Sequence, residues 1–184
     1  MRHDEITAAA FHESGHAVAI TLAFRKARWL PRPAPTLPVR YVQIDTPGSG
    51  CCIGKNIYSP RTSRLDDDHF PLMTAQVGIH IAGGIAESLH HCGTRPHGKE
   101  LWAFAEERCG VDGDLEHAND VLDDLWRLTG FRYYAHEFAE GVVAMLLDNW
   151  SAVSALAQAL IQRRRLDGDE VEKIIDRSLI RRAS

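Results

Sequence analysis

The stretch "TAAAFHESGHAVAITLAF", Thr7 to Phe24, decides much of the fold and raises the question of function. Its apolar and small residues recur at helical spacing, and Asp4 or Thr7 can serve as the cap, so we predict a helix that ends near Phe24. Gly15 lies inside this helix, where glycine costs about 1 kcal/mol relative to alanine. A glycine at this position indicates that a neighbouring element approaches the helix closely.

Two histidines on this helix are spaced to share one ligand. His12 and His16 lie four residues apart, hence on one helix face, and Glu13 directly follows the first of them. Catalytic zinc sites have three protein ligands and leave one position for water, whose proton a neighbouring carboxylate can accept. The H-E-x-x-H pattern therefore predicts a hydrolytic Zn²⁺ site with Glu13 as general base. The alternative is a half-buried amphipathic helix with two hydrogen-bonded structural histidines.

The bulk composition favours a soluble domain and excludes some classes of function. The 184 residues are 45% hydrophobic and 25% charged, which suits a single domain over residues 1–184. A net charge of -4 argues against a general nucleic-acid-binding protein. Every apolar run is interrupted before it reaches the length of a membrane span, and the first residues do not resemble a signal peptide. We therefore expect a cytoplasmic protein without direct membrane insertion, whose cysteines are free thiols: Cys51, Cys52, Cys92 and Cys109.

The rest of the chain predicts a mainly α fold with a small β element of two or three strands after the first helix. Four prolines between Pro31 and Pro38 indicate an extended loop. Alternating residues then predict two short strands joined by a Gly-rich turn. The strands are expected at 39–45 and 51–59, and helices at 69–92, 98–113, 114–130, 133–165 (one or two helices) and 167–180. The arginines at 163–165 are interpreted as a solvated helix end. Gly83 and Gly84 are tolerable in the second helix if another element packs closely against them.

Several motifs, in the same order along nearly the whole chain, resemble the peptidase domain of the FtsH family. "FHESGHAVA" resembles the family's "HEAGHA" zinc helix, and "IAGGIAES" resembles its "LGGRAAEE" helix. "GVDGDLEHANDVL" is similar to its "GASNDLERAT" segment, and "LDGDEVEKI" to its C-terminal "LDGEEI" ending. The resemblance implies a helical zinc metalloendopeptidase that hydrolyses unfolded or flexible polypeptides.

The third zinc ligand is implied by the same resemblance. The family's ligand is the Asp of "NDLE", which corresponds to Asp114 here. Asp114 also follows a Gly-rich turn and opens a helix, where the dipole favours a carboxylate, although a plain N-cap is the alternative. The rivals are Glu87 and Glu116, which could instead orient a ligand histidine, and Cys109. The other histidines have no comparable spacing and are interpreted as structural, among them His80, His90, His91, His97, His117 and His136. His3, His69 and His117 could approach the site, although no sequence pattern indicates it.

The sequence also departs from the family in ways that affect partners. It contains no G-x-x-x-x-G-K-[ST] pattern, so we expect no ATP binding of that kind. The resemblance therefore implies a free-standing peptidase domain that acts on unfolded polypeptides or with a separate ATPase chain, and a hexamer follows from the resemblance alone. Ile85 replaces the arginine of the family's "GGRAAEE" helix. Either strand could receive an extended substrate by backbone pairing. The alternative function is a non-catalytic, metal-binding adaptor or regulator that retains the fold.

Overall fold

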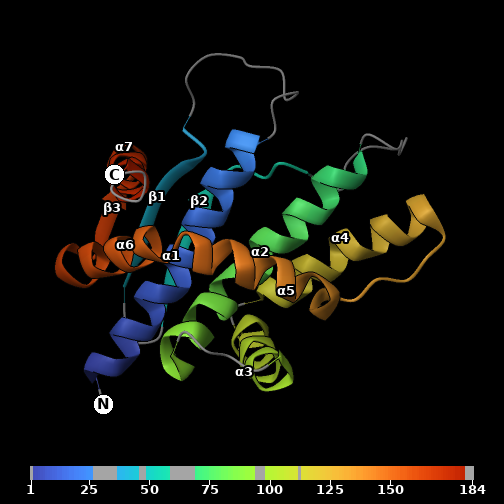
Figure 1. The fold of residues 1–184 in the computed structure, drawn as a ribbon, viewed down its shortest axis with the longest axis horizontal. Coiled ribbons are helices and arrows are strands. Elements are labelled where there is room, and N and C mark those ends of the chain that lie inside the picture. The colour runs from blue at the N-terminus through green and yellow to red at the C-terminus, as the bar shows by residue number, and fades with distance from the viewer. Residues whose placement is uncertain are drawn as a thin grey trace.

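The computed structural model describes residues 2–26, 37–45, 49–58, 69–93, 98–111 and 113–180. Within them the fold is mainly helical with one small antiparallel sheet, as predicted (Figure 1). The predicted proline-rich loop and most of the Gly-rich turn lie outside the described residues, as does His97. The helices are α1 (Arg2–Lys26), α2 (Phe70–Cys92), α3 (Gly98–Val111), α4 (Asp114–Thr129), α5 (Ala135–Asp148), α6 (Trp150–Arg163) and α7 (Gly168–Ile180), and the strands are β1 (Val39–Ile44), β2 (Gly50–Gly54) and β3 (Arg165–Asp167).

Helix α1 is the central element of the fold. All of its residues from 9 to 21 are buried, because α2 and α6 cover it together with the sheet (Figure 1). Gly15 meets α2, where an added Cβ would overlap the carbonyl oxygen of Ala82 and lie 2.6 Å from the Cβ of Ala86. The close approach that the sequence indicated at Gly15 is therefore confirmed.

The sheet has the order β2-β1-β3, with both pairs antiparallel. The two predicted strands are confirmed, although β2 ends at Gly54 and the predicted strand continued to residue 59. The prediction allowed for a third strand but did not locate β3. Arg164 ends α6 with a left-handed φ of 68°, and the next three residues pair with β1, so the predicted helix end at 163–165 is wrong after Arg163. Because β1 is the middle strand, it cannot receive a further strand. Among the described strands, β2 keeps an unpaired edge beside α1.

Three of the remaining helices, α3, α4 and α5, pack against α2, whereas α7 packs against α6. Gly84 allows α3 to pack on α2, because an added Cβ would lie 2.5 Å from Cys109 Sγ and 2.7 Å from the carbonyl oxygen of Ala105. Gly130 follows α4 in the left-handed conformation, at the end of the helix predicted for 114–130, and Asn149 separates α5 from α6. All four cysteines are free thiols, as expected.

No single helix in the described ranges is both long and apolar enough to cross a membrane. Within these ranges, α5 and α6 have the required length and apolar composition when taken together, but the two helices are bent by 76° relative to each other.

Candidate metal centre

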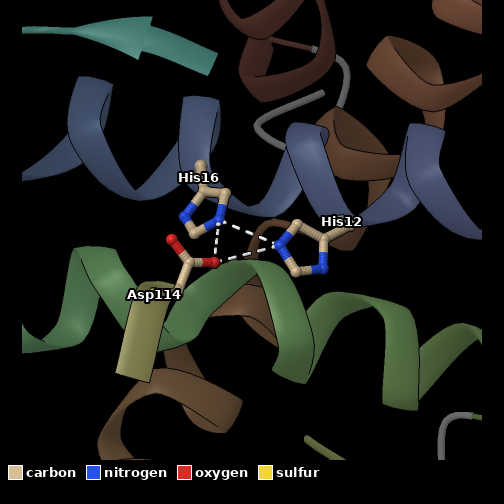
Figure 2. Close-up of side chains that lie close together, drawn as sticks. All are labelled: His12, His16 and Asp114. Carbon is tan, nitrogen blue, oxygen red and sulfur yellow. Dashed lines mark hydrogen bonds and ion pairs between the residues drawn. The ribbon is translucent and has the colours of Figure 1, made fainter. Parts of the chain in front are cut away.

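Three side chains from two helices converge on one point. His12 and His16 point from α1 toward α2, and Asp114 reaches them from the start of α4 (Figure 2). Oδ2 of Asp114 lies 2.8 Å from Nε2 of His16 and 3.1 Å from Nε2 of His12, and the two Nε2 atoms are 3.2 Å apart. The structure therefore brings together the three residues that sequence analysis named as ligands.

The spacing of these atoms fits a tetrahedral zinc ion. Zinc bonds to imidazole nitrogen and carboxylate oxygen of about 2.0–2.1 Å place neighbouring ligand atoms about 3.3 Å apart in a tetrahedron. The observed separations of 2.8 to 3.2 Å need only a small expansion. Two imidazoles with one carboxylate are also a donor set that suits a hydrolytic zinc site. Zinc binding itself stays a prediction.

Each imidazole is oriented by a hydrogen bond from its other nitrogen. Nδ1 of His12 donates to Oε2 of Glu87 at 3.2 Å, and Nδ1 of His16 donates to the carbonyl oxygen of Ile79 at 2.8 Å. Both acceptors belong to α2, and both turn Nε2 toward the centre. Such partners fix the ring orientation of metal-binding histidines. Arg108 of α3 in turn forms an ion pair with Glu87, with Nε 3.2 Å from Oε1.

Gly83 provides the space in which the two imidazoles meet. It lies on the face of α2 directed at α1, and an added Cβ would overlap Nε2 of both His12 and His16. The sequence indicated that this glycine needed a closely packed neighbour, but not that the neighbour was the pair of histidines. The glycine therefore serves the site as well as the packing.

The charges of the cluster favour proton binding in the metal-free protein. Burial alone would lower the pKa of His12 and His16, but the Asp114 carboxylate raises both, with Glu87 also raising that of His12. Although burial opposes it, the two imidazoles lower the pKa of Asp114. The atoms that would bind a metal ion therefore bind protons in the metal-free protein, and a metal ion must displace these protons.

The candidates for a third ligand differ in their position relative to the two histidines. Asp114 is not a plain N-cap, because Gly113 occupies the cap and the Asp114 carboxylate bonds the two histidines. Glu87 contacts the other nitrogen of His12, as a positioning group would. Glu116 is exposed, and the buried Cys109 Sγ lies near the carbonyl oxygen of Ile81, so neither belongs to the cluster found among the described residues.

Glu13 lies beside the cluster and against the sheet edge. Its side chain is buried, and an added Cβ on Gly50 would lie 2.7 Å from Glu13 Cγ and 2.9 Å from its Oε1. Two cavities meet here, because both are lined by His12, Glu13 and Gly50. One, of about 480 Å³, extends past Glu87 to α3, and the other, of about 250 Å³, extends along β2.

The smaller cavity contains two histidines that sequence analysis interpreted as structural. His80 and His117 line it together with the three side chains of the candidate metal centre, and the ring centroids of His80 and His117 are 5.6 Å apart. Burial and the neighbouring charge of His16 lower the pKa of His80 to about 4. The structural interpretation of His80 therefore missed its place in the site, whereas the approach that was left open for His117 is observed. The signal was present, because His80 lies three residues before Gly83 and therefore on its helix face.

Comparison with known proteins gives a distant similarity to a metalloprotease. No protein-family model matches the chain. Among curated proteins, it is similar to the ATP-dependent zinc metalloprotease FtsH 1 of Symbiobacterium thermophilum, with 28% identity over 181 residues. The similarity covers 91% of this chain but only 28% of that relative. It supports an FtsH-like relationship, and in general terms a zinc metalloprotease.

Proposed function

We propose that this chain is a zinc-dependent endopeptidase that hydrolyses unfolded or flexible polypeptides. The observation that carries the proposal is the convergence of His12, His16 and Asp114 next to Glu13, in a cavity bordered by an edge strand. A zinc ion held by the three side chains would lower the pKa of a water molecule and polarise a peptide carbonyl.

The chain's own residues supply the acid–base chemistry and the orientation of the substrate. Glu13 accepts the proton of the attacking water and delivers it to the leaving amine as the peptide bond breaks. β2 offers its free edge to the backbone of an extended substrate, with Gly50, Cys51 and Cys52 lining the cavity beside the cluster. The two cavities on either side of Glu13 then receive the substrate on the two sides of the scissile bond.

This arrangement explains why an extended polypeptide is the expected substrate. Backbone pairing to an edge strand requires several residues without secondary structure, which a folded protein rarely offers. The chain therefore cuts segments that are already unfolded, or it receives them from a separate ATPase chain. Assembly into a homo-oligomer, with a hexamer as the form that the family resemblance suggests, is part of the same proposal.

The deciding experiment compares the wild-type protein with Glu13→Gln on an unstructured substrate such as casein. We expect cleavage by the zinc-loaded wild type, no cleavage after chelation, and restoration when Zn²⁺ is returned. Glu13→Gln keeps zinc and fold but loses the base, so its turnover should fall by at least 10²-fold. Turnover at the wild-type level would contradict the general-base role.

A zinc-loaded wild type that cleaves nothing would instead favour the non-catalytic adaptor. The same preparation should then be tested with phosphinic peptides, which mimic the tetrahedral geometry of peptide hydrolysis. Tight binding without cleavage would indicate that substrate delivery is missing. Absence of binding would contradict the peptidase proposal.

A further inference from the structure

One face of α2 is built around the metal cluster and extends beyond it. Gln76, His80, Gly83 and Glu87 are spaced by four, three and four residues, so they lie on one side of the helix. Glu87 bonds Nδ1 of His12, and Gly83 lies against Nε2 of both ligand histidines. His80 is the next position of this face toward the helix N-terminus, and it lines the same cavity as the cluster.

Gln76 determines which nitrogen of His80 carries the proton. The backbone N–H groups of Ile57 and Tyr58 donate to Oε1 of Gln76, at 2.9 and 3.4 Å. This fixes the amide so that its Nε2 is the donor, and it lies 2.9 Å from Nε2 of His80. A ring nitrogen that accepts a hydrogen bond has no proton, so His80 is neutral with its proton on Nδ1.

The remaining nitrogen of His80 is a donor without a protein acceptor. No residue in the described part of the chain accepts a hydrogen bond from Nδ1, since the one hydrogen bond of His80 runs to Gln76 through Nε2. Positions one helical turn apart are about 5–6 Å from each other. His80 lies one turn from Gly83 and lines the same cavity as His12, His16 and Asp114, so a substrate group bound in that cavity can meet its ring.

We propose that Nδ1–H of His80 donates a hydrogen bond to the carbonyl oxygen of the scissile peptide and stabilises the negative charge that develops there. This inference rests on the proposed peptidase function. A neutral donor suits the position, because an imidazolium would repel the cation and an acceptor would repel the developing oxyanion. The low pKa caused by burial keeps His80 neutral at physiological pH. Removing one donor of this kind typically lowers kcat by about 10²–10³-fold.

The experiment uses two amide substitutions that place their nitrogen differently. The side-chain amide nitrogen of His80→Asn can occupy the position of Nδ1, whereas that of His80→Gln corresponds to Nε2. We expect His80→Gln and His80→Leu to lose about 10²–10³-fold in kcat at unchanged KM and zinc content, and His80→Asn to retain most of the activity. His136→Asn, an exposed histidine of α5, is the matched control. Wild-type kcat in His80→Leu, or equal losses in the Asn and Gln variants, would overturn the proposal.

Transition-state binding and the tautomer provide readouts that a structural role would not change. A phosphinic peptide should bind His80→Leu at least tenfold more weakly than the wild type, while a product peptide should bind equally well. Nitrogen-15 NMR of the metal-free protein should show His80 protonated on Nδ1. Gln76→Glu, whose carboxylate accepts but cannot donate, should move the proton to Nε2 and lower kcat as His80→Gln does.

The outcomes separate this inference from the proposed function. If the zinc-loaded wild type neither cleaves casein nor binds the phosphinic peptide, the peptidase function fails and this inference falls with it. If the wild type cleaves casein and binds the phosphinic peptide, and His80→Leu cleaves and binds equally well, only the role of His80 is overturned. A wild-type His80 that is protonated on Nε2 would overturn it independently of any activity.

Discussion

Replacement of Gly83 by alanine should abolish zinc binding more completely than it destabilises the fold. The added methyl group would overlap Nε2 of both His12 and His16, the two atoms that must face the ion. In the helix interior, alanine gains about 0.5–1 kcal/mol over glycine, whereas overpacking costs about 1–3 kcal/mol. The metal-free variant should therefore lose no more than about 2.5 kcal/mol in its free energy of unfolding.

Zinc affinity should fall much further, because neither ring can keep its position. We expect at least a hundredfold weaker binding, measured by competition with a chromophoric chelator. Zinc at a hundredfold excess over its dissociation constant stabilises the wild type by about 2.7 kcal/mol. At the same zinc concentration, a hundredfold weaker affinity leaves Gly83→Ala only about 0.4 kcal/mol of this increment, so zinc should raise its melting temperature far less than that of the wild type.

Two other glycines of α2 provide matched controls. At Gly78 an added Cβ would make an ordinary contact of 3.4 Å with Val142, so Gly78→Ala should stabilise the protein slightly and keep its zinc affinity. Gly84→Ala would collide with Cys109 on α3 and should destabilise the fold by about 1–3 kcal/mol, again with little change in zinc affinity. The reasoning would be refuted if Gly83→Ala bound zinc as tightly as Gly78→Ala.

Three further predictions concern the ligands and their partners. Asp114→Ala should strongly lower the zinc affinity measured by chelator competition, because it removes the only oxygen ligand of the cluster found among the described residues. Retention of tight zinc binding would indicate a different third ligand. Glu87→Gln should weaken zinc binding by about 10–100-fold, because the acceptor for Nδ1 of His12 loses its charge, and unchanged affinity would contradict its positioning role. Because the pKa values of His12 and His16 are raised, the pair keeps protons at pH values above 6.5, the ordinary histidine pKa. Zinc binding at pH 7 should therefore release at least one proton, and zinc affinity should increase as the pH rises. Calorimetry in buffers of different ionisation enthalpy measures that release, and a value of zero would contradict it.

The sequence could predict the elements that carry the site because their signals are local. His12, Glu13 and His16 fall within five residues of one helix, and helix periodicity alone places the two imidazoles together. Asp114 required the family resemblance, because it lies 102 residues from His12 and nothing local shows that the start of α4 meets α1.

The parts that could not be predicted depend on tertiary contacts. β3 is three residues long and pairs only because the chain returns to β1, so no periodicity could reveal it. The sequence also could not show which of the two predicted strands has a free edge, because β1 becomes the middle strand only through its pairing with β3. Arg164, a non-glycine residue with positive φ, ends α6 without the glycine that usually marks such an end.

The site itself divides between a local motif and a helix face that had no motif. α1 carries His12, His16 and Glu13, and α4 adds Asp114, whereas α2 supplies what orients the two histidines: a carboxylate for His12, a carbonyl for His16, and the gap at Gly83. The spacing of Gln76, His80, Gly83 and Glu87 was visible in the sequence as one face of a helix. Its meaning depended on knowing that this face lies against the zinc-binding motif. In our proposal the substrate contacts Glu13 from one helix and His80 from the other, so the packing of α1 on α2 would set the geometry of catalysis as well as the stability of the core.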